Sequence, residues 1–150
     1  MKRKLPVVLA VVLLVAADAP KEDPGKKELE KLKGAWTTAS IEYNGKQHEE
    51  LAKQLRFVFK GDTATVEGSA AVRKEYAKLT FKLDPSTTPK LLDLTVLAGV
   101  QKDAVMEGIY EMKDDELKIC LKVLGKERPT EFASPAGASI ALLVLKREKP

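Results

Sequence analysis

Segments in which apolar and polar residues alternate recur from residue 35 to residue 147, and this pattern constrains the fold more than any other feature. In residues 76–83, for example, Leu79, Phe81 and Leu83 occupy every second position, with polar residues between them. A period of two is that of a β-strand with one buried face. Strands of an antiparallel sheet with one solvent-exposed face show this alternation, whereas strands of a parallel sheet that is buried on both faces do not. The chain therefore predicts an antiparallel all-β fold.

The alternating segments predict about eight strands, which are separated by turn signals such as Asn44-Gly45 and Asp84-Pro85. The expected strands cover residues 35–43, 56–60, 63–67, 76–83, 90–97, 105–112, 117–123 and 140–147. Residues 26–33 predict a short N-terminal helix and residues 47–53 a second one. Because closing a sheet removes its edges, we expect an up-and-down antiparallel barrel of about eight strands with a short N-terminal helix.

Gly34-Ala35-Trp36 stands at the start of the first expected strand. A glycine followed by a large aromatic residue at this place predicts a Trp36 side chain that closes one end of the barrel. A barrel of eight strands either fills its interior with side chains or holds one small ligand.

The N-terminus has the pattern of a secretory signal peptide, which we expect to span residues 1–17. Lys2, Arg3 and Lys4 precede an apolar run that is shorter than the roughly 20 residues needed to span a membrane, and Val15 and Ala17 suit a cleavage site. Cleavage after Ala19 is the second choice, and an uncleaved anchor or a buried helix is the alternative. With no cysteine near the site for lipid attachment, we expect an exported protein, periplasmic or secreted, without a stable membrane anchor. Residues 18–28 predict a flexible linker and residues 29–147 a single barrel domain.

Net charge and cysteine content limit the classes of partner. Removing residues 1–17 leaves 23 basic and 22 acidic side chains, which gives no electrostatic footprint for nucleic acid. Cys120 is the one cysteine, so an intrachain disulfide is excluded and stability has to come from the core.

Several segments together resemble a known group of proteins. Gly34-Ala35-Trp36 matches the Gly-x-Trp of lipocalins, and residues 40–46, 81–85, 108–111 and 127–132 are similar to an uncharacterised lipocalin-like family found mainly in planctomycete bacteria. The resemblance runs from about Leu29 to Arg147. It implies a calycin-type barrel in an exported protein and no reaction. It also implies that a cation near the end of the last strand packs over Trp36; Arg147 suits this better than Lys146.

Three features of the sequence are candidate sites of chemistry. His48 is the only histidine and has no nucleophile or second metal ligand nearby in sequence, so we interpret it as a solvated helix residue. The acidic residues 114–116 are interpreted as a solvated turn rather than a calcium site. Cys120 is either activated by Lys118 and Lys122 or, the interpretation we favour, covered by the N-terminal helix or a loop. We therefore expect no catalysis, no metal and no cofactor.

The residues expected to face the interior are almost entirely apolar, and they include Leu142 and Val144 of the last strand. The structural residues are Gly34, Trp36 and Arg147, and the expected ligand pocket is formed by Phe57, Phe59, Phe81, Met106, Gly108, Tyr110, Met112 and Ile119. Gly108 leaves a gap in this lining, or marks a bulge. Two functions remain open: binding of a small hydrophobic molecule in the barrel, with residues 47–55 covering its mouth, or action of a filled barrel in the envelope through its outer surface.

Overall fold

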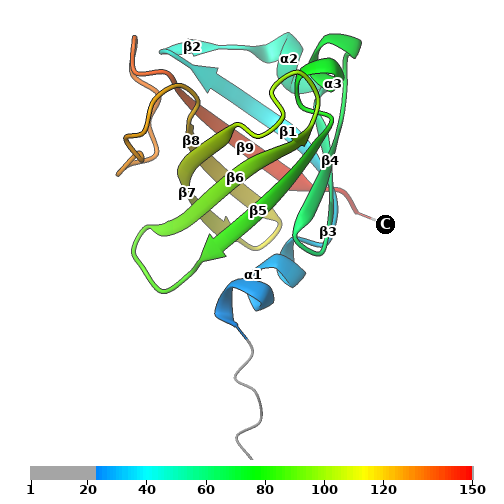
Figure 1. Cartoon of the computed structure of the whole chain (residues 1–150), viewed down its shortest axis with the longest axis vertical. Coiled ribbons are helices and arrows are strands. Elements are labelled where there is room, and N and C mark those ends of the chain that lie inside the picture. The colour runs from blue at the N-terminus through cyan, green and yellow to red at the C-terminus, as the bar shows by residue number, and fades with distance from the viewer. Residues whose placement is uncertain (1–22, 150) are drawn as a thin grey trace, which may run out of the picture.

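The computed structural model describes residues 23–149, so the expected signal peptide and residues 18–22 of the expected linker lie outside the described residues. Within this range, eight antiparallel strands close into a barrel (Figure 1). They are β1 (Gly34–Tyr43), β3 (Arg56–Lys60), β4 (Thr63–Glu67), β5 (Lys78–Asp84), β6 (Lys90–Ala98), β7 (Val105–Lys113), β8 (Glu116–Lys122) and β9 (Ile140–Arg147). A two-residue strand, β2 (Lys46–Gln47), extends β1 through a hairpin. The all-β, up-and-down barrel predicted from the alternation is confirmed.

The barrel closes between its first and last strands. Each strand pairs with its neighbour in the chain, and β1 also pairs with β9, with Trp36 opposite Arg147. The register between these two strands shifts at Thr38 and Ser40. A shift of this kind marks a β-bulge, which bends a strand and increases its twist. The bulge therefore lies at the seam where the sheet closes.

Three short helices lie at the two ends of the barrel (Figure 1). α1 (Pro24–Leu32) covers one end, which we call the floor. α2 (Glu49–Gln54) and α3 (Ala70–Glu75) lie at the opposite end, which we call the mouth. The third helix was not expected from the sequence. Ser69 begins it by accepting a hydrogen bond from the Val72 amide, and none of its residues is fully buried.

The floor helix is part of the domain rather than of a linker. Asp23 caps its first turn by accepting a bond from the Gly25 amide, and Pro24 occupies the first helical position. Gly25, Glu28, Leu29 and Leu32 are buried along one face, at the three- and four-residue spacing of an amphipathic helix. Residues 24–28 of the expected linker therefore belong to the helix that seals the barrel.

The last strand presents the opposite face to the one expected. Leu143 packs against the core and Leu145 is fully buried, whereas Leu142 pairs with Cys120 and Val144 with Lys118 on the outer face. The six consecutive apolar residues from Ile140 to Leu145 carry no alternation to choose between the faces. The pairing with β1 and β8 makes that choice, because residues opposite each other in adjacent strands share one face.

In the described part of the chain, no helix has both the length and the apolar character required to cross a membrane.

Candidate functional site

Trp36 closes the floor, as its position in the sequence predicted. Its side chain is fully buried, and its Nε1 donates a 2.7 Å hydrogen bond to the carbonyl of Leu32 at the end of α1. The Arg147 guanidinium lies 4.4 Å from the indole centroid and donates to the carbonyls of Lys31 and Lys33. One cation thus stacks on the Trp36 ring and satisfies two terminal carbonyls of the helix. Gly34 begins β1 with a φ of 121°, a conformation that favours glycine.

Besides the contacts of Trp36 and Arg147, hydrogen bonds of Glu28 also hold α1 against the barrel. Its carboxylate accepts hydrogen bonds from Tyr110 (2.8 Å), Lys31 (3.0 Å) and Lys90 (3.2 Å). Burial raises the pKa of Glu28, but the bonds from Lys31, Tyr110 and Lys90 outweigh it, so the pKa lies below its usual value. Burial, and next the carboxylate of Glu28, raise the pKa of the Tyr110 phenol. The Tyr110 hydroxyl therefore holds the floor together and is not free for a ligand.

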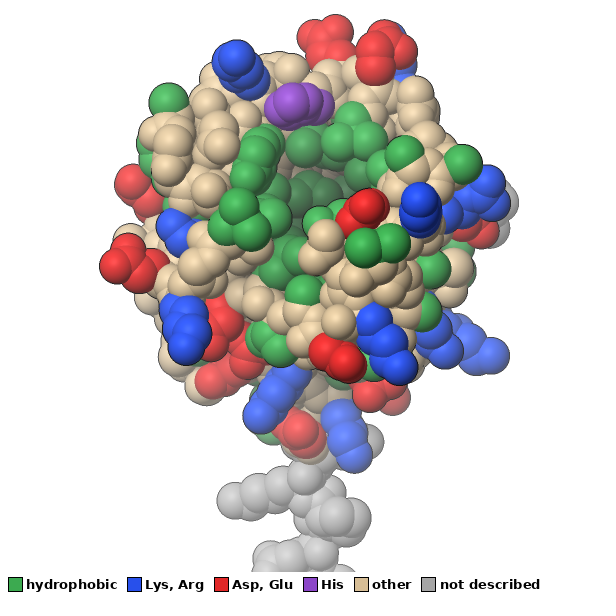
Figure 2. Space-filling model, turned by 45° about the horizontal axis from the view of Figure 1, so that its top comes forward, with side chains coloured by type: hydrophobic (Ala, Val, Ile, Leu, Met, Phe, Trp, Pro, Cys, Tyr) green, Lys and Arg blue, Asp and Glu red, His purple; other side chains and the backbone are tan. Residues whose placement is uncertain are grey.

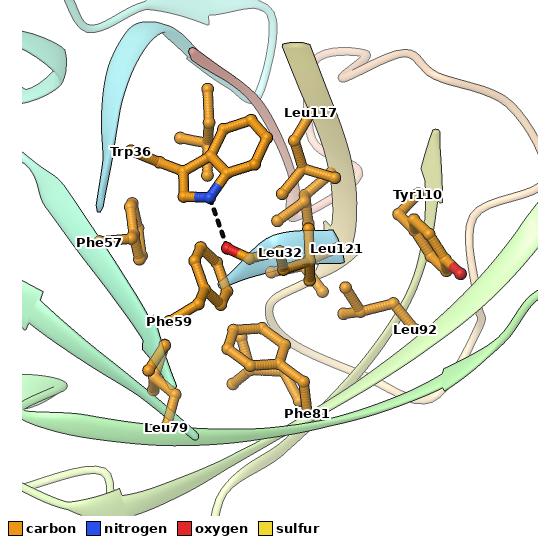
Figure 3. Packing of buried hydrophobic residues seen from close by; sticks show 14 of the residues in the cluster. Leu32, Trp36, Phe57, Phe59, Leu79, Phe81, Leu92, Tyr110, Leu117 and Leu121 are labelled. Carbon is orange, nitrogen blue, oxygen red and sulfur yellow. Dashed lines mark hydrogen bonds between the residues drawn. The ribbon is translucent and has the colours of Figure 1, made fainter. Parts of the chain in front are cut away.

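Aromatic rings fill the half of the interior next to the floor (Figure 3). Trp36 and Phe59 meet edge to face at 6.4 Å, and Phe59 lies 6.3 Å from Phe57 and 5.4 Å from Phe81. Leucine side chains complete this layer, and the Tyr110 hydroxyl points away from it. Three members of the expected ligand pocket are thus side chains of a packed core.

The other expected pocket residues are dispersed along the barrel. Met106 and Ile119 are buried in the interior, and Met112 is half-buried near the floor end of β7. Gly108 also faces inward, opposite Leu92 and Leu121, but a Cβ there would collide with the carbonyl oxygen of Cys120. Gly108 therefore allows β7 and β8 to approach closely and leaves no gap in the lining.

The mouth is hollowed and apolar. Figure 2, which brings this end forward, shows a depression whose walls and bottom are hydrophobic side chains. Half-buried apolar residues pack on the core near this end, from α2, α3, the β6–β7 loop and the adjoining strand ends: Leu51, Val72, Tyr76, Ala104, Val123 and Leu143. Residues 47–55 cover part of the mouth through α2, as expected. The packed aromatic layer thus lies at the floor, and the hydrophobic hollow lies at the mouth.

Two tyrosines and the histidine add polar groups near the mouth. Tyr43 ends β1 on its inward side, opposite Ala141, and Tyr76 follows α3. Burial raises the pKa of the Tyr76 phenol, and the neighbouring Glu75 and Tyr43 raise it further. His48 precedes α2 as its N-cap residue, half-buried and without a side-chain capping bond, so it is not the solvated helix residue that we expected. These groups offer hydrogen bonds at the rim of an otherwise apolar opening.

Two grooves lie outside the barrel. One, of about 1030 Å³, runs between α1 and the outer faces of β5 and β6, and Phe81 is the one expected pocket residue that lines it. The other, of about 530 Å³, lies beside the β7–β8 turn. Both are open depressions on the outer surface, so neither enlarges the interior site.

Cys120 is covered, in agreement with the favoured interpretation. It lies on the outer face of β8, fully buried, and its Sγ is 3.5 Å from the carbonyls of Glu131 and Ala133 in the loop that follows β8. Burial raises the pKa of the Cys120 thiol, which opposes the activation proposed for its lysine neighbours. The same loop is held by Arg128, which donates to the carbonyls of Leu92 and Gly108. The loop is therefore a cover over a small outer core.

The acidic residues 114–116 form the β7–β8 turn and begin β8, and Asp115 pairs with Arg147 at 3.2 Å. Among residues 23–149, no three His, Cys, Asp or Glu side chains come together in an arrangement that would hold a metal ion.

Sequence reasoning missed the polar groups of the interior. In the sequence, Glu28 is one of many charged residues in a Lys/Glu-rich helix. Its burial depends on Lys90 and Tyr110, which lie 62 and 82 residues further along the chain. Thr38 lies in the first strand as an ordinary β-branched residue, yet it is buried. For Tyr43, the alternation of apolar and polar residues in β1 could have indicated an inward side chain, although the bulge at Thr38 and Ser40 shifts that alternation by one residue.

In the comparisons with known proteins, no family model matches the chain, and neither a curated protein nor a solved structure shows significant similarity to it.

Proposed function

We propose that this protein binds a small apolar molecule through the mouth of the barrel. The observation that carries the proposal is the hydrophobic hollow at that end, opposite a floor sealed by Trp36 and α1. Ligand sites in proteins are concave and mostly apolar, with a few polar groups that set orientation, and the mouth has this character. Membership of the lipocalin-like family is likewise a proposal, and the resemblance by itself implies no ligand.

The two helices at the mouth suit an entrance. Ala52 is the buried residue of α2, and α3 has none, so little apolar contact holds either helix in place. Segments with few buried contacts open at low free-energy cost. We therefore expect the ligand to enter beside α3, whose Val72 faces the core.

The test is uptake of N-phenyl-1-naphthylamine, an uncharged dye that fluoresces in apolar surroundings, by protein stripped of lipid. Wild-type protein should bind the dye, and Val72→Arg should weaken binding at least tenfold. Ala71→Arg is the matched control, because Ala71 is exposed on the same helix. Absence of dye uptake by the folded wild-type protein, together with absence of any thermal shift, would overturn the proposal.

A second candidate function is that of a non-catalytic envelope protein whose barrel binds no small molecule and which contacts other components through its outer surface. It is favoured by four exposed hydrophobic side chains at the mouth end: Leu97, Val100, Val105 and Leu124. Exposed apolar residues that gather in one region are typical of interaction surfaces. This function takes the place of the first if the dye experiment fails.

Export and the absence of catalysis are also proposals. The signal peptide proposed for residues 1–17 supports a periplasmic or secreted location. The intact mass of the exported protein should correspond to a chain that begins at Asp18, or at Pro20 as second choice; a retained Met1 with membrane association would contradict it.

A further inference from the structure

Thr38 carries a buried hydroxyl without a hydrogen-bond partner. Within residues 23–149, its Oγ1 is the one buried side-chain oxygen or nitrogen for which the structure provides neither donor nor acceptor. The residue is 8% exposed, and its backbone amide is already used, donating to the carbonyl of Leu55. Most buried polar side-chain atoms have a partner, so an exception of this kind requires an explanation.

The hydroxyl belongs to the interior of the barrel. Thr38 lies opposite Leu145, which is fully buried, and follows the inward-facing Trp36 by two positions. Beyond the bulge, the same face of β1 continues through Ile41 to Tyr43 near the mouth. Thr38 thus stands on the inward face of β1, between the sealed floor and the hollow at the mouth.

Charge decides what kind of group can pair with this hydroxyl. Among residues 23–149, the one buried charged residue, Glu28, is paired with Lys90 at the floor, and Arg147 is held by carbonyls of the α1 terminus and by Asp115. A charged ligand group beside Thr38 would therefore be buried without a counter-ion, which is unfavourable. An uncharged hydroxyl or carbonyl can exchange a hydrogen bond with a threonine hydroxyl, which both donates and accepts.

We propose that Thr38 is a specificity-determining residue whose hydroxyl binds the polar group of an uncharged ligand with an apolar body. The inference rests on the proposed binding function and adds the chemical class of the ligand. The Thr38 hydroxyl should thus favour ligands with one neutral hydrogen-bonding group over pure hydrocarbons and over carboxylates.

The test compares three probes of the same ring shape: naphthalene, 1-naphthol and 1-naphthoate. Their affinities are measured by displacement of N-phenyl-1-naphthylamine from wild-type protein and from Thr38→Val, Thr38→Ser and Thr65→Val. Thr65→Val is the control, because Thr65 is exposed on the outer face of β4. Wild-type protein should prefer 1-naphthol to naphthalene about fivefold to tenfold, with 1-naphthoate weakest. Thr38→Val should abolish the preference, and Thr38→Ser and Thr65→Val should keep it.

The possible outcomes distinguish failure of the role proposed for Thr38 from failure of the proposed binding function. If wild-type protein binds the dye but does not distinguish 1-naphthol from naphthalene, the inference is wrong and the binding function stands. The same conclusion follows if Thr38→Val keeps the preference, or if 1-naphthoate binds as tightly as 1-naphthol. If no probe and no dye binds, the binding function itself fails. Should Thr38→Val not fold, Thr38→Cys, which is close in size and a weak hydrogen-bonding group, replaces it with the same expected loss of preference.

Discussion

Replacement of Trp36 should cost more stability than any other single change at the floor. The side chain is fully buried, donates to Leu32, meets Phe59 edge to face and lies under Arg147. Trp36→Ala removes all of these contacts, and a large buried aromatic truncated to alanine destabilises by about 3–5 kcal/mol. Trp36→Phe keeps part of the ring but leaves the Leu32 carbonyl unpaired, which costs about 1–3 kcal/mol.

Urea unfolding followed by far-ultraviolet circular dichroism measures these differences. Fluorescence is unsuitable, because Trp36 is the only tryptophan of the chain and both variants lack it. Leu124→Ala is the control, because Leu124 is exposed, and it should change the unfolding free energy by less than about 0.5 kcal/mol. The reasoning is refuted if Trp36→Ala unfolds within about 0.5 kcal/mol of wild type, or if Trp36→Phe costs as much as Trp36→Ala.

Three further predictions concern the floor, the close strand pair and the covered thiol. Glu28→Gln should lower the unfolding free energy at pH 7 by about 1–3 kcal/mol. Because the folded-state pKa of Glu28 lies below its usual value, this contribution is present above the unfolded pKa of about 4.3 and disappears as pH falls through the folded pKa. Thermal melts from pH 7 to pH 3 should show the two proteins converging, and a constant gap would contradict the assignment. Gly108→Ala should destabilise by about 1–3 kcal/mol, since its Cβ would collide with the Cys120 carbonyl; an unchanged urea midpoint would show that β7 and β8 can separate there. Cys120 should react with Ellman's reagent in urea but only slowly in buffer, whereas rapid labelling of the native protein would mean that the covering loop opens freely.

The patterns with a clear period predicted their structures correctly. Alternation in β5 through β8 gave strands with the expected inward residues, because a half-buried strand needs a period of two wherever its partners lie. Trp36 and Arg147 were matched across the chain through a family resemblance, and the structure stacks them. Cys120 was placed correctly on the outer face by the same alternation.

The features that were missed depend on partners distant in the chain. The six apolar residues from Ile140 to Leu145 carry no period, so only pairing with β1 and β8 decides that Leu143 faces inward. Gly108 was interpreted as a gap, but the closeness of β8 fills the space where a side chain would go.

The sequence by itself determined the class of fold and the approximate strand positions, because local periodicity reports which side of a segment is buried. Only the tertiary structure decided which polar groups are enclosed. The Glu28 carboxylate is satisfied by Tyr110 and Lys90, whereas the side-chain hydroxyl of Thr38, next to the seam bulge, has no hydrogen-bond partner within the described residues. Burial and hydrogen bonding are properties of neighbours in space, and closure of the barrel is what brings those neighbours together.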